Sequence, residues 1–274
     1  MTTPFTAKTL AFLRALKRNN DREWFRARKP DYERHVRQPM IELLARLQRD
    51  LRRFAPELVA DPKVSLYRIY RDTRFSGDKS PLKTHVAAHF PSRAFGRAGG
   101  AGLYLEIAPQ WVWIGGGLYM PATADLQAIR EYVAATYPQV HRIANGRAFR
   151  RQVGELGGER LTRVPRGYAK DHPAAHYLQF KQFLAGREYP ADLAVSRRFY
   201  PELTAVFRSV APLVRFLNAP LEARLAPHDP PAPARQLEGL PGAGRSRRRD
   251  ATAKLVGTPG VEGTSPPARP APMW

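Results

Sequence analysis

Cysteine is absent from the 274-residue sequence. This absence excludes disulfide bonds, thiolate metal sites and cysteine nucleophiles. The sequence also has no apolar run near the ~20 residues that cross a bilayer, and its first residues lack the cationic and apolar segments of a signal peptide. We therefore expect a soluble cytoplasmic protein that has no membrane partner.

Lysine is also scarce, because only nine of the 45 basic residues are lysines and the other 36 are arginines. The net charge is nevertheless +21, and most of it lies before residue 227. Such a charge favours an anionic partner, either nucleic acid or a phosphorylated small molecule. An arginine-rich composition also arises in a G+C-rich genome without selection for binding, so the charge alone does not choose between these explanations.

Apolar residues recur regularly up to about Ala226 and nearly vanish after it. The segment 227–274 is instead rich in proline, glycine and arginine, and it cannot bury enough apolar surface to offset the entropy lost on ordering. We predict a single α+β domain over residues 1–226 and a disordered tail over residues 227–274.

Helical spacing of apolar residues begins and ends the predicted domain. The first part contains a helix over residues 6–18 capped by Thr6, a second helix capped within Asn19-Asn20-Asp21, and a third that starts near Pro30 and is broken or kinked at Pro39. The last part contains four helical segments, and two prolines interrupt the last of them. These segments are residues 123–137, 141–151, 174–184 and 196–217.

Alternating apolar residues between these helices predict a sheet. The predicted strands cover residues 63–70, 84–90, 102–108 and 111–114, and a short link joins the last two as a hairpin. Gly115, Gly116 and Gly117 then end the alternation. The predicted fold class is therefore α+β, with an N-terminal helical layer packed on a mainly antiparallel sheet and further helices at the C-terminal end.

Trp111 and Trp113 are two residues apart on one predicted strand, so their side chains lie on the same face of the sheet. We expect the N-terminal helices to cover that face and to make both indoles part of the core. Stacking of nucleic-acid bases on these rings is the alternative.

The stretch from Arg68 to Lys83 combines more charged side chains with fewer apolar ones than any other segment. Guanidinium groups bind phosphate and carboxylate through two parallel hydrogen bonds, and lysine adds a movable point charge. Asp72 and Asp78 could orient these cations, or they could hold a divalent metal that bridges to phosphate. An internal network of salt bridges is the alternative. The cations are Arg68, Arg71, Arg74, Lys79 and Lys83.

The glycine triplet is a weaker candidate. Gly115, Gly116 and Gly117 could form the far wall of a pocket beside the charged stretch, with backbone N–H groups directed at a phosphate. A bulge or tight bend explains the same glycines.

Two pairs of histidines are also weaker candidates. His85 and His89 have a spacing that metal ligands use, but no acidic residue falls between them. His172 or His176 could act as a general base. We assign no metal, cofactor or catalytic residue from these patterns, and the oligomeric state stays open.

Several short motifs resemble the signature of one family. They are Asn19-Asn20, Trp24-Phe25, the charged residues of 68–83 with Pro81, the glycines of 115–117, and residues 165–168 and 170–173. The family is the bacterial group called domain of unknown function 2461 (DUF2461), and the resemblance spans most of residues 5–217. It implies an α+β domain and no particular activity. Leu82 departs from the pattern, because family members usually have tyrosine there.

These observations favour a protein that binds a phosphorylated or otherwise anionic small ligand through the loop of residues 68–83. Whether it catalyses a reaction stays open. The first alternative is a nucleic-acid-binding protein without sequence preference, which uses its basic surface and Arg245–Arg249. The second is a structural or interaction protein whose charged loop is only an internal salt-bridge network.

Overall fold

The computed structural model describes residues 3–74, 77–96 and 99–225. These residues contain a four-stranded antiparallel sheet in which strands adjacent in the chain are also neighbours in the sheet. Helices precede and follow the strands, so the predicted α+β class is confirmed. The predicted disordered tail lies outside the described residues, and the division of the chain near residue 226 stays a prediction. The strands are β1 (Val86–Pro91), β2 (Gly102–Ile107), β3 (Trp111–Leu118) and β4 (Phe183–Pro190).

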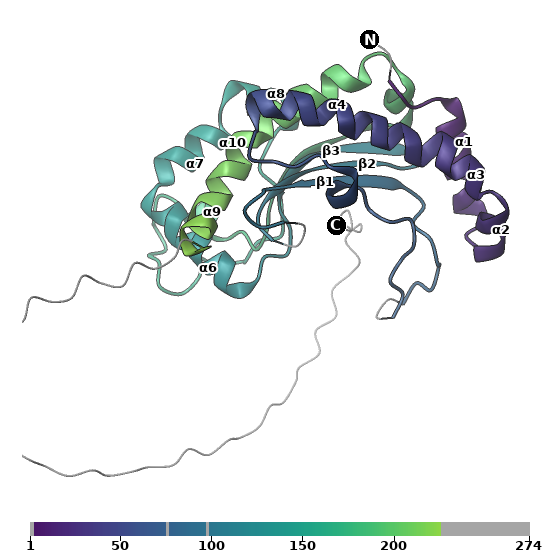
Figure 1. Ribbon diagram of the computed structural model, residues 1–274. Helices are drawn as coiled ribbons and strands as arrows, with labels where there is room; N and C mark the ends of the chain where they lie inside the picture. Colours follow the sequence, from purple (N-terminus) through teal and green to yellow (C-terminus); the bar gives the residue numbers. More distant parts are fainter. Residues whose placement is uncertain (1–2, 75–76, 97–98, 226–274) are drawn as a thin grey trace, which may run out of the picture. The chain divides into compact units, whose positions relative to one another are not determined.

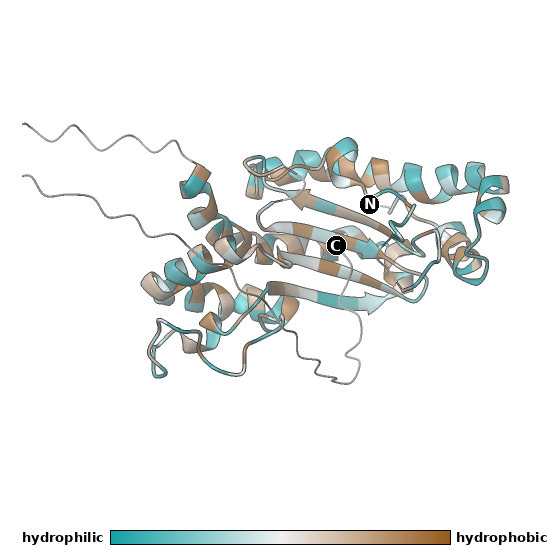
Figure 2. Cartoon of the chain, turned by 90° about the horizontal axis from the view of Figure 1, so that it is seen from below, coloured by the Kyte–Doolittle hydropathy of each residue, from teal (hydrophilic) through white to brown (hydrophobic). Residues whose placement is uncertain are grey.

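The long helices lie together on one side of the sheet. Figure 1 shows α1, α4 and α10 on the same side of the strands, and the view from below in Figure 2 places the strands in front of them. Within the described ranges, no helix is long and apolar enough to span a membrane. The helices are α1 (Ala7–Arg18), α2 (Arg22–Ala27), α3 (Lys29–Tyr32), the π-helical turn η1 (Glu33–Arg37), α4 (Gln38–Phe54), α5 (Pro62–Ser65), α6 (Thr123–Ala135), α7 (Tyr137–Ala144), α8 (Arg147–Val153), α9 (Ala175–Leu178), the 3-10 helix η2 (Ala191–Val195) and α10 (Phe199–Leu225).

The sheet has two differently built faces. Along β2 the side chains of Leu103, Leu105 and Ile107 belong to the hydrophobic core. Tyr104 and Glu106 alternate with them and therefore lie on the opposite face, because successive side chains of a strand point to opposite sides. We call these the core face and the polar face. All of β2 is buried, so both faces are covered at this strand.

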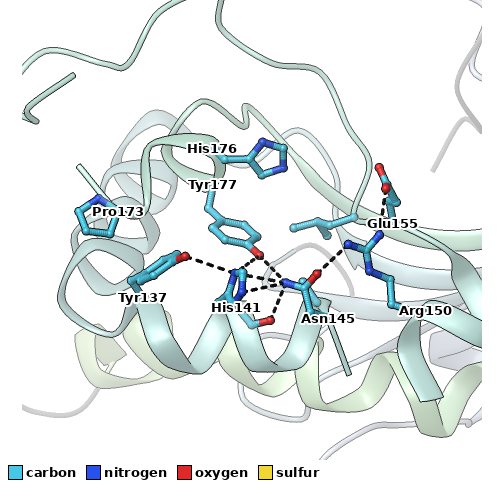
Figure 3. A pocket seen from close by; sticks show the side chains of 10 residues that line it. Tyr137, His141, Asn145, Arg150, Glu155, Pro173, His176 and Tyr177 are labelled. Carbon is cyan, nitrogen blue, oxygen red and sulfur yellow. Dashed lines mark hydrogen bonds and ion pairs between the residues drawn. The ribbon is translucent and has the colours of Figure 1, made fainter. Parts of the chain in front are cut away.

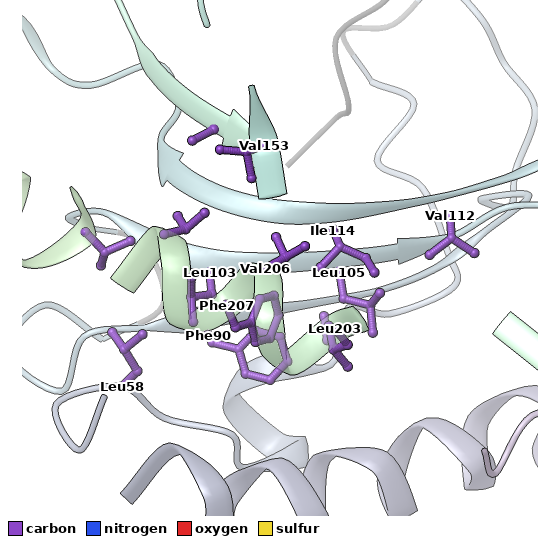
Figure 4. Packing of buried hydrophobic residues seen from close by; sticks show 14 of the residues in the cluster. Leu58, Phe90, Leu103, Leu105, Val112, Ile114, Val153, Leu203, Val206 and Phe207 are labelled. Atoms are coloured by element: carbon purple, nitrogen blue, oxygen red, sulfur yellow. The ribbon is translucent and has the colours of Figure 1, made fainter. Parts of the chain in front are cut away.

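Helix α10 covers the core face. Phe207 of α10 packs edge-on against Phe90 of β1, with ring centroids 5.1 Å apart. Figure 4 shows Leu103 and Leu105 of β2 close to these rings and to Leu203 of α10. Since burying one such side chain contributes about 1.5–3 kcal/mol, this layer fixes α10 firmly on the sheet.

The predicted start signals of the first two helices are confirmed. Thr6 is the N-cap of α1. The carboxylate of Asp21 accepts hydrogen bonds from the backbone N–H groups of Glu23 and Trp24 at 2.8 and 2.9 Å. These bonds satisfy donors that have no partner within the first turn of α2.

Pro39 changes the third predicted helix without ending it. The helical chain continues from α3 through η1 into α4, and Pro39 lies in the first turn of α4. Because proline has no N–H, it cannot donate to the carbonyl of His35 four residues earlier. Thr9 of α1 donates its hydroxyl to that carbonyl at 2.7 Å. The Thr9 side chain of α1 thus supplies a hydrogen bond to the backbone carbonyl that Pro39 cannot reach as a donor.

The strand predicted over residues 63–70 is wrong. Asp61 caps the short helix α5 instead, since its carboxylate accepts a hydrogen bond from the Lys63 N–H at 2.7 Å and Pro62 fits the first turn. The chain around α5 follows the outer edge of β1 through isolated bridges rather than as a continuous strand. Bridges in this region join Leu58 to Ser92, Leu66 to Ala88 and Tyr70 to Leu82.

Two predictions toward the C-terminal end are also wrong. Residues 174–184 form only the short α9 as a helix, and Phe183 already begins β4, which pairs with β3. The predicted helix over residues 141–151 is divided into α7 and α8. The two shorter helices considered possible because of Pro201 and Pro212 do not form, since α10 runs from Phe199 to Leu225 and includes both prolines. The sequence does not predict β4, because the apolar spacing before residue 184 fits a helix and a strand equally well.

Trp111 and Trp113 share one face as predicted, but it is the polar face. Their neighbours in β3, Val112 and Ile114, are the side chains that belong to the core. The expectation that the N-terminal helices cover both indoles is therefore wrong, and both side chains are half-buried on the other side of the sheet.

Gly115, the first glycine of the triplet, lies inside β3 and makes room for an indole on the polar face. A Cβ atom on Gly115 would lie 2.2 Å from the carbonyl oxygen of Ala185 and 2.6 Å from the Trp113 ring. One on Gly186 of β4 would lie 2.3 Å from the same ring. Glycine at both positions therefore leaves the space that the Trp113 ring fills.

Gly116 and Gly117 also lie inside β3, so the bulge or bend expected for the triplet is wrong. Gly116 pairs with Leu103 of β2 and Ala185 of β4, and Gly117 continues the same ladder. A Cβ atom on Gly116 would lie 2.5 Å from the carbonyl oxygen of Gly102. Gly116 alternates with Gly115 and therefore belongs to the core face. The two neighbours thus face opposite sides of the sheet.

We predict that Gly115→Ala lowers the free energy of unfolding by about 1–3 kcal/mol, because the added methyl group must displace β4 or the Trp113 ring. Urea unfolding followed by tryptophan fluorescence measures this change. Gly77→Ala is the matched control, since its Cβ would meet nothing within 4 Å, and it should stay within about 0.5 kcal/mol of wild type. Equal stability of the two variants would contradict the close packing at Gly115.

Candidate functional site

The predicted site residues from Arg68 to Lys83 lie on two segments that run antiparallel to each other. We call these segments, residues 68–74 and 77–83, the arms. The N–H of Arg71 donates to the carbonyl of Pro81 at 3.0 Å, and the N–H of Lys83 donates to that of Ile69 at 2.8 Å. The arms therefore pair as a short ladder next to β1, and this ladder fixes where the charged side chains begin.

Asn20 ties this ladder to the N-terminal helices. Its amide group donates to the Leu82 carbonyl at 2.8 Å, and its side-chain oxygen accepts from the Leu82 N–H at 3.0 Å. The side chain of Leu82 is fully buried in the core. Both the backbone and the side chain of Leu82 thus hold the second arm, one residue before Lys83.

Two ion pairs occupy the outer end of the arms. Arg74 binds Asp72 through two hydrogen bonds of 3.0 and 2.8 Å, which hold the pKa of that carboxyl below its usual value. Arg71 binds Asp78. Lys79 donates to a backbone carbonyl at 3.1 Å. At this end each carboxylate is matched by an arginine, as the salt-bridge alternative predicts.

Two of the predicted cations, Lys83 and the Arg71 of the second ion pair, are half-buried, and we call them the inner cations. The Arg71 side chain is 13% exposed, and Nζ of Lys83 lies 4.5 Å from the centre of the Tyr67 ring. Burial lowers the pKa of His85, and the charges of Lys83 and Arg71 lower it further, so both cations act on this imidazole. The other five residues are exposed: Arg68, Asp72, Arg74, Asp78 and Lys79.

Three polar side chains, two of them buried and the third half-buried, lie together on the polar face, where the charges of these cations act. Glu106 of β2 is 2% exposed. Its Oε2 accepts a hydrogen bond from the Tyr104 hydroxyl at 2.6 Å, and its Oε1 lies 3.1 Å from Nδ1 of His85. The second ring nitrogen of His85, Nε2, is buried and has no hydrogen-bond partner among the described residues. We call Tyr104, His85 and Glu106 the acid–base cluster.

The environment shifts the two titrating groups of the cluster in opposite directions. Burial raises the pKa of Glu106 to about 7, against the hydrogen bond from Tyr104 and the charge of Lys83, which lower it. Burial together with Lys83 and Arg71 lowers the pKa of His85 to about 4. The imidazole therefore stays neutral near neutral pH while the carboxyl group titrates. Buried groups with shifts of this kind are typical of sites that exchange protons.

Aromatic rings surround the acid–base cluster. The rings of Tyr67 and Tyr104 meet edge-on with centroids 6.3 Å apart, and those of Tyr104 and Trp113 lie 5.8 Å apart. The rings keep water away from Glu106, which is the physical cause of its raised pKa.

The predicted pocket wall is divided by the alternation of β3. Gly115 lies against the Trp113 ring, on the same face as the acid–base cluster. Gly116 lies on the core face, where a Cβ atom would come within 3.0 Å of the Leu103 side chain. Gly117 returns to the polar face, one strand position beyond Gly116. Gly116 is therefore not beside the cluster, and a wall formed by the whole triplet does not fit a flat strand.

Sequence patterns do not single out Glu106 or Tyr104. The available signal is a single carboxylate within the otherwise apolar segment 102–108, since a buried acid is rare unless it is paired. His85 stands out in the sequence only with His89, as a pair of metal ligands. In the part of the chain that the structure describes, no group of three or more His, Asp or Glu side chains could hold a metal ion.

A family match covers most of the described chain. Residues 8–216 match the family described as "Conserved hypothetical protein (DUF2461)". The chain belongs to the DUF2461 family. The matched residues include both arms, the acid–base cluster and the whole sheet. Comparison with curated proteins gives no match. The family description names no activity, so the function has to be argued from the geometry.

This DUF2461 chain also has a cavity of about 300 Å³ that is lined by residues of α7, α8 and α9 and of the segments next to them. Figure 3 shows the hydroxyl groups of Tyr137 and Tyr177 directed toward His141, and each lies 3.3 Å from its Nδ1. Asn145 lies 3.2 Å from the same nitrogen and accepts a hydrogen bond from Arg150 at 2.7 Å. The polar side chains of this cavity thus bind mainly one another.

The two histidines proposed as general bases differ in position. His176 lines the cavity, and Arg160 lies 3.4 Å from its Nδ1. His172 accepts a hydrogen bond from the Ala174 N–H at 3.0 Å, which is a local capping role. Neither residue contacts a carboxylate in the way that His85 contacts Glu106.

We predict that Glu106→Gln changes how stability depends on pH. Because burial raises the pKa of Glu106 in the folded state, its contribution to the free energy of unfolding is fully present below pH 4.5. This contribution is lost as the pH rises through about 7. Between pH 4.5 and about 7.5 wild type should therefore lose ~3 kcal/mol of its free energy of unfolding relative to the Glu106→Gln variant. Urea titrations across this range measure it. Glu131→Gln, at an exposed position, controls for the change in net charge. A difference in free energy of unfolding between wild type and Glu106→Gln that stays constant with pH would contradict the raised pKa of the buried carboxyl.

Proposed function

We propose that this DUF2461 chain binds an anionic small molecule, phosphorylated or otherwise, on the polar face of the sheet beside Lys83 and Arg71. The position of these two cations carries the proposal. Both are partly buried, and both act on the same buried imidazole. Removing cations from water costs solvation free energy, and an anionic ligand that binds them offsets part of this cost.

The individual residues have distinct roles in this proposal. Lys83 supplies a point charge, and Arg71 supplies a planar guanidinium that Asp78 orients. The Tyr67 ring supports Lys83 from one side. Arg68, Arg74, Lys79 and Asp72 lie farther out, where the net positive charge of the arms attracts anions over a distance.

The surroundings favour a small ligand over a nucleic acid. A protein that binds the backbone of nucleic acids without sequence preference presents an extended row of exposed cations. The inner cations here are Lys83 and Arg71 alone among the predicted residues, and the Tyr67 ring lies against both Lys83 and Tyr104. Two neighbouring cations favour a small anion over a polymer.

A thermal-shift screen with inorganic phosphate and a panel of phosphorylated metabolites tests the proposal. A ligand at 100 times its Kd adds about 2.7 kcal/mol of stability, which raises the Tm of a chain of this size by about 5 °C or more. We predict that wild type shows such a shift, and that Arg71→Gln and Lys83→Gln abolish it. Arg74→Gln is the matched control, because its ion pair with Asp72 lies on the outer side.

The alternatives give different results in the same screen. A salt-bridge network alone predicts that Arg71→Gln lowers the Tm and that no anion shifts it. Nucleic-acid binding predicts a shift with single-stranded DNA that falls steeply with salt and decreases equally in all three variants. Either result would contradict the proposed small-ligand site.

A further inference from the structure

The two nitrogens of the His85 ring have unequal environments. Nδ1 lies 3.1 Å from Oε1 of Glu106, whereas Nε2 is buried and has no hydrogen-bond partner in the described part of the chain. The Tyr104 hydroxyl already donates to Oε2 of Glu106 at 2.6 Å. A carboxylate in this position accepts a hydrogen bond from an Nδ1–H group. The neutral His85 ring therefore carries its hydrogen on Nδ1, and Nε2 is left as a hydrogen-bond acceptor.

A buried acceptor in a native protein is nearly always matched by a donor. The groups that face His85 are Glu106, Lys83, Arg71 and, through Glu106, Tyr104. Lys83 and Arg71 are cationic, and with burial they disfavour a second proton on the ring. A proton that reaches Nε2 is therefore not kept by the imidazole, and the adjacent carboxylate is the group that can receive one.

We propose that His85 and Glu106 form a proton relay, in which Nε2 of His85 accepts the proton of a hydroxyl group on an anionic ligand held by Lys83 and Arg71. In the first transfer the O–H bond of the ligand breaks and an N–H bond forms at Nε2 of His85. In the second, the N–H bond at Nδ1 breaks and an O–H bond forms at Oε1 of Glu106. The ligand gains one negative charge beside the two cations, Glu106 becomes neutral, and the imidazole is neutral before and after. This inference rests on the proposed anion site and adds the chemistry that the site supports.

Tyr104 is a positioning residue in this relay. Its hydroxyl occupies Oε2 of Glu106 and so leaves Oε1 to His85. The ligand class that follows is an oxyanion that carries a hydroxyl group, either on the anionic centre or close to it. An oxyanion of the same shape and charge without a proton cannot donate to Nε2.

The ¹⁵N NMR shifts of the His85 ring test the relay without any ligand. At pH 8 the ring should carry its proton on Nδ1. Between about pH 8 and pH 6 the proton should move to Nε2 as Glu106 is protonated, and no imidazolium should form. Glu106→Gln should show the Nε2–H tautomer throughout, because a glutamine amide can donate to Nδ1. The His85→Gln variant assigns the signals. A wild-type ring that carries its proton on Nε2 at pH 8, or that becomes imidazolium above pH 6, would overturn the relay.

Binding of phosphate and of sulfate at pH 8 tests the acceptor, because both are then mainly dianions of similar shape and only phosphate keeps an O–H group. We expect wild type to bind inorganic phosphate about tenfold more tightly than sulfate, the effect of one hydrogen bond at a buried acceptor. Glu106→Gln should reduce this ratio to about one. Equal binding of the two anions by wild type overturns the relay and leaves the proposed anion site intact. Binding of neither anion overturns both.

Discussion

The carboxylate of Glu106 is the constraint on which the polar face depends. A carboxyl group that is 2% exposed keeps a charge only where donors replace water. Tyr104 and His85 supply those contacts, and the ring of Trp113 helps to exclude solvent. Trp113 fits only because glycine is its neighbour in both β3 and β4. The protonation of Glu106 therefore depends on how the strands pack around Trp113, and a change in this packing alters the pKa of Glu106.

The cations reach this carboxylate through a contact far away in the sequence. Asn20, between the first two helices, binds both backbone polar groups of Leu82. Lys83 follows directly, and its charge acts on both His85 and Glu106. Asn20 thus has a structural role, because it sets the position of a side chain more than sixty residues later.

Local signals predict the fold better than the site. Caps such as Asp21 and the helical spacing of apolar residues act within a few positions, so the N-terminal helices follow from the sequence. The fourth strand does not, because its identity depends on pairing with β3. Gly115 looks like a loop residue until the Trp113 ring beside it is known. The role of Glu106 does not follow from the sequence either, since one of its partners is His85, which is far from it in the chain. Charge density singles out the arms, but only three-dimensional contacts separate Lys83 from the exposed cations.

The edges of the sheet are also accompanied by other segments of the chain. Bridges from Leu58 and Leu66 run along the outer side of β1, and Gly157 exchanges two backbone hydrogen bonds with Leu184 of β4. Bare strand edges recruit strands from other molecules and seed aggregation. By pairing part of both borders with its own irregular segments, the chain limits intermolecular strand addition. The loops flanking the sheet thus cover part of its edges as well as carrying the arms.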